Sequence, residues 1–343
     1  MKNHLTVLLI AVLSFFSCSH YFTEGDYFFI SRAGAEMPAW VRGNTDSGVF
    51  IIVNHGGPGG TASYLCNFYA MKELEKKYAL VYWDQRCSGI SQGNAAATTF
   101  TADDFVLDLD LLTDAVIANY EPSALFIYGI SWGGTLGTAY LTDPVRQNKI
   151  SGFIEEGGGH NMPLLMELSS ELVLAYAEGR IAAGADRDYW SGAVSLLSEK
   201  PDPALWSAED YYAYADYLLN AHPFEFTPSP YPGEYSGPDS GDIFLSPLSF
   251  AMFLNPGMLV KNFNILTLDL NPIMPAITLP VLLLWGAYDK NSPVQMAENA
   301  ADRLGTAPAD LRLRIIPDSG HNTAIDQPDL FLAEFTGFVE AFR

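Results

Sequence analysis

The sequence predicts an α/β fold in which a mostly parallel sheet carries helices on both faces and a mainly helical cap is inserted between two parts of the sheet. Short apolar runs, typical of buried parallel strands, alternate with helical segments over residues 21–158 and again over residues 276–343. Over residues 159–275 proline and aromatic residues increase, and no run predicts a buried strand. A chain of 343 residues, 49% of them hydrophobic, is long enough to bury the core of such a fold.

In the first part of the predicted sheet, strands are followed by polar or glycine-rich turns. Aromatic and polar residues alternate around residues 27–31 and 37–41, which predicts two antiparallel edge strands. The apolar run 49–54 predicts a buried strand that leads into His-Gly-Gly-Pro-Gly-Gly at 55–60, where backbone N–H groups can face a ligand. The other elements expected here are a helix over 62–78, a strand over 80–83, a loop over 84–91, a helix over 103–119 and a strand over 150–154.

The segment Gly-Ile-Ser-Trp-Gly-Gly at 129–134 lies between an apolar run, 125–128, and an expected helix, 135–141. Glycine on both sides of Ser131 allows a sharp turn that holds the hydroxyl out of the sheet. The N–H of Trp132, at the start of the helix, points toward negative charge that would develop on a substrate. G-x-S-x-G alone is a common pattern, but the strand before it and the helix after it predict that Ser131 is a catalytic nucleophile.

The second part of the sheet brings two further polar residues to the same edge. An apolar strand over 279–284 is followed by Asp289, and a strand over 311–316 is followed by His321. Because the carboxyl ends of parallel strands meet at one edge, Ser131, Asp289 and His321 are expected on one rim, in the chain order serine, acid, histidine. Taken alone, Asp289 could instead cap a helix and His321 could lie on the surface. The helices expected here are 293–304 and 328–342.

The cap is predicted from the change of pattern over residues 159–275. Residues 211–218 predict a helix, and residues 223–238 form a proline-rich loop. The tyrosines of that helix recur at helical spacing, which favours core packing over substrate contact.

Three motifs form a specific combination: H-G-G-P-G at 55–59, D-Q-R at 84–86 and G-x-S-W-G-G at 129–134. Together they resemble the proline iminopeptidase (prolyl aminopeptidase) branch of the α/β-hydrolase superfamily, over residues 25–158 and 276–343 but not the cap. The resemblance implies an α/β-hydrolase fold. It implies that Ser131 is the nucleophile, His321 the general base and Asp289 the residue that orients it. It also implies an oxyanion hole made by the amides of Gly57 and Trp132.

The chain departs from that family in the loop after D-Q-R. The family has glycine at the position of Cys87, whereas Gly89 and Ser91 keep the pattern D-Q-R-G-x-G-x-S. Because cysteine tolerates a positive φ less well than glycine, we expect this loop to be rebuilt.

The resemblance implies a serine aminopeptidase that releases N-terminal residues, preferably proline, from short peptides through an acyl-enzyme. Such an enzyme must hold a free amine, for which carboxylates are the natural partner. Glu155 and Glu156 directly follow a predicted strand on the rim of Ser131, and we expect them to bind the substrate amine. Residues 159–275 add 15 Asp+Glu against 4 Lys+Arg. The cap carboxylates considered are Glu209, Asp210, Asp216 and Glu225. An esterase or amidase with the same triad, and a triad-bearing ligand-binding protein, are the alternatives.

The composition of the chain argues against several classes of binding partner. The chain has 18 Lys+Arg against 40 Asp+Glu, a net charge of −22, which argues against nucleic acid and anionic membrane surfaces as partners. His55, His160 and His222 lack neighbours at metal-ligand spacing, and the glycine runs match neither a phosphate loop nor a dinucleotide loop. We therefore expect neither a metal nor a cofactor.

Residues 1–17 predict an export signal, because Lys2 precedes an apolar run too short to span a bilayer. Ser17-Cys18 resembles a bacterial lipobox, which implies a lipid-anchored protein of the cell envelope that begins at Cys18; cleavage near Ser19 is the alternative. Two later cysteines, Cys66 and Cys87, could form a disulfide or remain free thiols.

Overall fold

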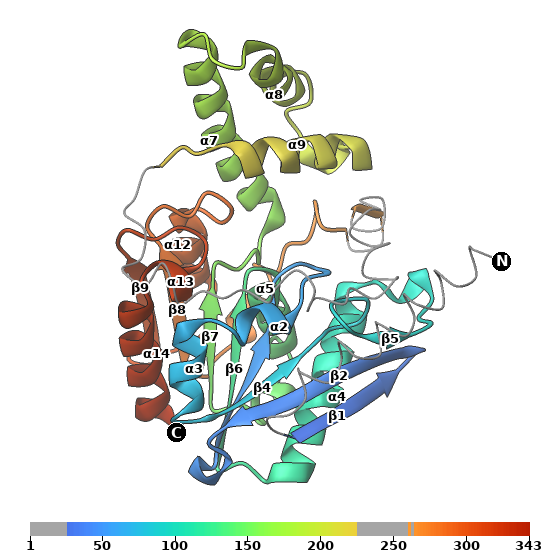
Figure 1. Ribbon diagram of the computed structural model, residues 1–343, viewed down its shortest axis with the longest axis vertical. Helices are drawn as coiled ribbons and strands as arrows, with labels where there is room; N and C mark the ends of the chain where they lie inside the picture. The colour runs from blue at the N-terminus through green and yellow to red at the C-terminus, as the bar shows by residue number, and fades with distance from the viewer. Residues whose placement is uncertain (1–25, 225–259, 262–263) are drawn as a thin grey trace, which may run out of the picture.

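One mixed sheet organises the residues described by this computed structural model, which are 26–224, 260–261 and 264–343 (Figure 1). Within them the sheet has nine strands in the order β1-β2-β4-β3-β6-β7-β8-β9, with β5 paired to β2. β1, β2 and β5 pair antiparallel, and the pairs that connect β4, β3, β6, β7, β8 and β9 are parallel. The predicted mostly parallel sheet is therefore confirmed. The strands are β1 (Asp26–Arg32), β2 (Ala35–Gly43), β3 (Val49–Asn54), β4 (Ala79–Trp83), β5 (Gln92–Gly93), β6 (Ala124–Ile130), β7 (Gly152–Glu156), β8 (Val281–Gly286) and β9 (Leu311–Ile316).

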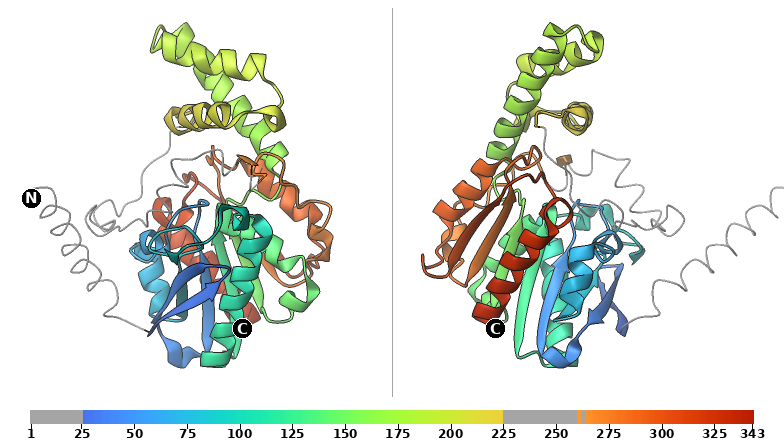
Figure 2. Two further views of the ribbon diagram at one scale, coloured as in Figure 1. Left: turned by 90° about the vertical axis from the view of Figure 1, so that its right-hand side faces the viewer. Right: turned by 60° about the vertical axis from the view of Figure 1, so that its left-hand side comes forward.

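Alternate residues of the central strands point into two apolar layers. Along β3, Phe50 and Ile52 belong to one layer, whereas Ile51 and Val53 belong to the other. Helices α4, α5 and α12 cover the first layer, and α3 and α14 cover the second (Figures 1 and 2). Each large apolar side chain buried in this way contributes about 1.5–3 kcal/mol. These helices are α3 (Tyr69–Glu75), α4 (Ala102–Tyr120), α5 (Trp132–Leu141), α12 (Val294–Arg303) and α14 (Pro328–Phe342).

The helix predicted over residues 62–78 is two helices, α2 (Ala62–Leu65) and α3, so this prediction is wrong in its extent. The chain leaves helical geometry at Phe68, with φ −68° and ψ 141°, and the ring of Phe68 is buried in the second layer. Asn67 donates a side-chain hydrogen bond to the carbonyl of Ser63 and so closes the end of the first helix. The helix therefore breaks where the Phe68 ring is buried, although the sequence pattern over residues 62–78 is continuous.

The cap lies between β7 and β8, and its described part is mainly helical (Figure 1). Asn161 caps the first helix by accepting a hydrogen bond from the amide of Leu164. Ser207 and Asp210 form a capping box at the start of the third cap helix, Ala208–Asn220. Two short helices, α6 and α13, lie outside the cap at loops of the sheet domain. The helices are α6 (Pro144–Gln147), α7 (Met162–Ala182), α8 (Arg187–Glu199), α9 (Ala208–Asn220) and α13 (Thr323–Asp326).

Several sequence predictions fall wholly or partly outside the described residues. The signal segment 1–17, Cys18 and Glu225 lie outside them, as does most of the proline-rich loop 223–238. Within the described ranges, none of the helices has the length and apolar character needed to cross a membrane. Cys66 and Cys87 are both buried and free, so the structure contains no disulfide between them.

A buried ion pair ties the loop after β4 to α4. The guanidinium of Arg86 donates to both carboxylate oxygens of Asp108, with Nη2 2.6 Å from Oδ1, and neither side chain is exposed. Nη1 of Arg86 also donates to the carbonyl of Thr99 at 2.9 Å. Burial raises the pKa of Asp108 despite the opposing effect of Arg86. The desolvation cost of this pair is therefore large, and each charge needs the other.

We predict that Arg86→Met destabilises the protein by about 3 kcal/mol, because it leaves the Asp108 carboxylate buried with less compensation. Urea unfolding followed by circular dichroism measures this. The double variant Arg86→Met/Asp108→Leu should recover most of the loss. Arg314→Met, which breaks an exposed pair with Glu334, should cost less than about 1 kcal/mol. An equal loss of unfolding free energy in Arg86→Met and Arg314→Met would contradict the structural role given to the buried Arg86–Asp108 pair.

Candidate active site

Ser131 lies at the apex of the turn between β6 and α5 in a strained backbone conformation. Its φ is +55°, a region that non-glycine residues rarely adopt. A Cβ at Gly129 would lie 2.2 Å from the carbonyl oxygen of Gly133, and a Cβ at Gly133 would lie 2.0 Å from the carbonyl oxygen of Asn54. These glycines are therefore required by close backbone contacts. The amide of Ser131 donates to the carbonyl of Glu156 at 2.7 Å, which ties the turn to the end of β7.

Asp289 and His321 form a hydrogen-bonded pair beside this turn. Nδ1 of His321 lies 2.7 Å from Oδ2 of Asp289, and Asp289 is 2% exposed. The other carboxylate oxygen of Asp289 accepts the amides of Asn291 and Ser292 at 2.8 and 2.9 Å. Asp289 thus organises the turn before α12 and still presents an oxygen to the histidine. With a proton on Nδ1, His321 keeps Nε2 as an acceptor.

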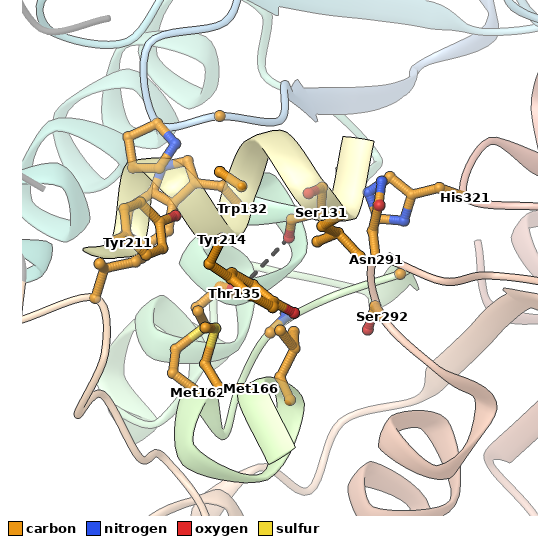
Figure 3. Close-up of a pocket in the computed structure, with 18 residues that line it drawn as sticks. Ser131, Trp132, Thr135, Met162, Met166, Tyr211, Tyr214, Asn291, Ser292 and His321 are labelled. Carbon is orange, nitrogen blue, oxygen red and sulfur yellow. Dashed lines mark hydrogen bonds between the residues drawn. The ribbon is translucent and has the colours of Figure 1, made fainter. Parts of the chain in front are cut away.

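Ser131 and His321 line one cavity of about 190 Å³ at the carboxyl edge of the sheet, and Figure 3 shows them next to each other. The structure therefore brings together the three residues predicted for the triad. Gly157 packs against the imidazole, because a Cβ there would lie 3.0 Å from two ring atoms of His321. The wall facing them comes mainly from the cap and is largely apolar. Its cap residues include Met162, Leu165, Met166, Tyr211, Tyr214 and Leu218.

The environment of His321 shifts its proton affinity in two directions. Burial lowers the pKa of His321, whereas the charge and hydrogen bond of Asp289, together with the charges of Glu156 and Asp326, raise it by more. The pKa therefore lies above its ordinary value of 6.5. Glu156 adds to the increase through its charge.

The two amides expected to form an oxyanion hole lie on the same cavity. Gly57 has φ +135° and follows β3 closely, and Trp132 is the first residue of α5. Both residues line the cavity with Ser131. A Cβ at Gly57 would lie 2.6 Å from the amide nitrogen of Gly59, so this position accepts only glycine in the observed conformation.

Gln85 connects these two segments, a role that the sequence analysis did not assign to any residue. The indole Nε1 of Trp132 donates to Oε1 of Gln85 at 2.9 Å, and Nε2 of Gln85 donates to the carbonyl of His55 at 3.0 Å. Nδ1 of His55 donates to the carbonyl of Gly56 at 2.7 Å, and Nε2 of His55 accepts the amide of Gln85 at 3.2 Å. Burial lowers the pKa of His55 to about 4, so this imidazole is neutral. The motifs H-G-G-P-G and D-Q-R were the signal for this network.

The loop after D-Q-R keeps the left-handed turn that we expected cysteine to disrupt. Cys87 itself has φ +51°, so the expected rebuilding does not occur at this residue. Asp84 holds the loop by accepting the amides of Ala62 and Ile90 at 2.8 and 2.7 Å. A Cβ at Gly89 would lie 1.9 Å from the carboxylate of Asp84, which explains the glycine there.

The prediction that Glu155 and Glu156 bind a substrate amine is corrected by their burial. Their exposure is 0% and 1%, and neither lines the cavity. Glu156 accepts hydrogen bonds from the hydroxyl of Tyr128 at 2.5 Å, and from the amide and hydroxyl of Thr323 at 2.6 and 2.7 Å. Glu155 accepts from the hydroxyl of Thr138 at 3.2 Å. Successive side chains of a strand point to opposite faces of the sheet, so Glu155 and Glu156 point toward the helices on the two faces and not onto the rim.

The cap carboxylates in the described ranges also lie away from the cavity. Asp210 serves the capping box of α9 and pairs with Lys200. Asp216 accepts the hydroxyl of Tyr189 at 2.6 Å. None of the described residues that line the cavity is Asp or Glu. Tyr214, which the sequence assigned to the core, is buried in it, and Tyr211 packs against it; both also line the cavity.

Comparisons with known proteins agree with this fold. The family model described as alpha/beta hydrolase fold matches residues 49–328. The proline iminopeptidase of Neisseria meningitidis serogroup B is 26% identical over 303 residues, which cover 84% of this chain and 87% of that protein. The crystal structure of VinJ has a TM-score of 0.65 at 18% identity and covers 93% of this chain and 99% of its own. That of proline iminopeptidase from Mycobacterium smegmatis has a TM-score of 0.62 at 19% identity, covering 92% and 98%. At these identities the two structures show likeness of fold alone.

We predict that the imidazole of His321 titrates above pH 6.5 and that Asp289→Asn lowers this pKa. The carboxylate stabilises the protonated ring, and the amide that replaces it carries no charge. Nitrogen-15 NMR of the histidine rings as a function of pH measures the titration. Asp143→Asn, a change of the capping residue of α6, should leave it unchanged. A pKa that is the same in wild type and Asp289→Asn would contradict the coupling of the pair.

Proposed function

Because this chain belongs to the alpha/beta hydrolase fold family, we propose that it is a serine aminopeptidase that releases N-terminal residues, preferably proline, from short peptides. The observation that carries this proposal is the cavity that Ser131 and His321 line, with Asp289 hydrogen-bonded to His321. The likeness to proline iminopeptidases over most of the chain supports the choice of substrate class.

In the proposed reaction, the hydroxyl oxygen of Ser131 attacks the scissile carbonyl carbon while Nε2 of His321 takes the hydroxyl proton. Asp289 stabilises the imidazolium that forms. The carbonyl oxygen becomes an oxyanion that the amides of Gly57 and Trp132 stabilise. Collapse of this intermediate breaks the C–N bond, and His321 returns the proton to the leaving amine. Water then hydrolyses the acyl-enzyme by the same steps, releasing the N-terminal residue and restoring Ser131.

The shape of the cavity supports a compact apolar group on the acyl side. Its volume is about 190 Å³, and methionine, leucine and tyrosine side chains of the cap form its wall. A pyrrolidine ring is compact and apolar on its carbon edge, so it can replace water there without leaving polar groups unpaired.

One observation favours a second candidate, an esterase or amidase that acts on a small apolar acyl group. The described wall of the cavity offers no carboxylate to a substrate ammonium. An ester substrate needs no such partner. The two candidates therefore differ in one measurable property, which is the requirement for a free amine.

We predict that prolyl naphthylamide is cleaved and that its N-acetyl derivative is not. A panel of aminoacyl naphthylamides beside p-nitrophenyl esters measures both activities. Ser131→Ala should reduce turnover of every cleaved substrate by about 10⁴-fold or more, because the nucleophile is lost. Ser195→Ala, which changes a serine of α8 that bonds Glu199, serves as the control. Equal cleavage of free and N-acetylated substrates would refute the aminopeptidase and leave the esterase or amidase.

We also propose that the mature protein begins at Cys18 and carries lipid there. The apolar run after Lys2 and the pair Ser17-Cys18 motivate this. Mass spectrometry of the protein from a membrane fraction should find an acylated N-terminal cysteine, and Cys18→Ala should move the protein out of that fraction. An unmodified N-terminus at Ser19 or His20 would overturn the proposal.

A further inference from the structure

One short turn holds the acid of the proposed triad and also contacts the cap. Asp289 lies between Tyr288 and Lys290 in the turn after β8. Asn291 and Ser292, which follow, donate their amides to Asp289 and line the cavity. The turn therefore connects the acid and the cavity wall directly.

Lys290 extends from this turn to the C-terminal end of α9. Its Nζ donates to the carbonyl of Leu219 at 2.9 Å and also to the carbonyl of Ala221. Carbonyls at the end of a helix lack donors within the helix and carry partial negative charge, so an ammonium is their natural partner. Burial lowers the pKa of Lys290, as expected for an ammonium withdrawn from water.

A second contact on the other side of Asp289 joins the same two segments. The ring of Phe224, just after α9, lies against the ring of Tyr288 with centroids 5.4 Å apart. The residues on both sides of the acid thus hold the end of one cap helix. In Figure 1, α9 crosses above the sheet.

The helix held in this way forms part of the cavity. Tyr211, Tyr214, Ala215 and Leu218 of α9 line it, and Tyr214 is buried. Figure 3 shows Tyr211 and Tyr214 among the side chains of this cavity. Leu218 directly precedes Leu219, whose carbonyl Lys290 binds. A shift at the C-terminal end of α9 therefore changes the wall that faces an acyl group.

We propose that Lys290 is a positioning residue that latches α9 to the Asp289 turn and so sets the size of the acyl pocket. Lys290 does not touch the reacting atoms in this role. It acts through the carbonyls at the end of α9 on the side chains that line the cavity. The kinetic consequence rests on the proposed hydrolase function, whereas the structural consequence does not.

The test compares Lys290→Met with Lys290→Arg and with Lys200→Met. Methionine keeps an unbranched apolar stem and removes the ammonium, and arginine keeps a cation with several donors. Lys200 pairs with Asp210 near the opposite end of α9, so Lys200→Met is a matched control for the loss of a cap lysine. The probes are p-nitrophenyl acetate, whose acyl group is small, p-nitrophenyl hexanoate, and prolyl naphthylamide.

In Lys290→Met we expect KM for prolyl naphthylamide and the hexanoate to change about tenfold, with kcat/KM for the acetate unchanged. Hydrogen exchange of the α9 amides, read by mass spectrometry, should be at least about tenfold faster. Lys290→Arg should restore both properties, and Lys200→Met should alter neither. The proposed latch would be overturned if Lys290→Met kept the wild-type hydrogen-exchange rates in α9 and the wild-type KM for prolyl naphthylamide and the hexanoate. If the wild-type chain hydrolyses none of the probes, the proposed function fails, and the exchange rates alone still decide the latch.

Discussion

The site depends on one place where two backbone segments approach more closely than any side chain allows. The start of α5 rests against the end of β3 at Gly133, where a Cβ would lie 2.0 Å from the carbonyl oxygen of Asn54. This contact fixes the turn that holds Ser131 at φ +55°. The glycine-rich loop continues directly from Asn54, so the same contact places Gly57 beside the turn. Strain of about 1–3 kcal/mol at Ser131 is tolerated because every residue of β6 is buried around it.

Buried polar side chains connect the loops that this contact brings together. Gln85 links Trp132 to the segment at His55, and Glu156 links Tyr128 of β6 to Thr323, two residues after His321. Such acceptors already have their hydrogen bonds and are withdrawn from solvent. They hold loops in place and are poorly suited to take a substrate charge. In this strongly acidic chain, the cavity wall that the structure describes is nevertheless largely apolar and contains no Asp or Glu.

The two histidines near the site show how environment decides the role of one residue type. His55 is buried without a carboxylate partner, and its pKa falls to about 4, so it serves as a neutral hydrogen-bonding spacer. His321 is only partly buried, with 24% of its side chain exposed, and the Asp289 carboxylate raises its pKa above the ordinary value. Only the second environment suits a base that must accept and return a proton.

The sequence by itself determined the parallel sheet, the turn at Ser131, and the positions of Asp289 and His321 after consecutive strands. These follow from local rules: apolar runs form buried strands, glycines permit tight turns, and parallel strands end at one edge. Tertiary structure alone decided that Glu155 and Glu156 are buried, because their side chains point to opposite faces of the sheet and meet Thr138 of α5 and Thr323 of α13 there. It also decided that the predicted helix 62–78 breaks at Phe68, and that tyrosines of α9 face the cavity. Those outcomes depend on contacts between residues far apart in the chain, which local periodicity does not encode.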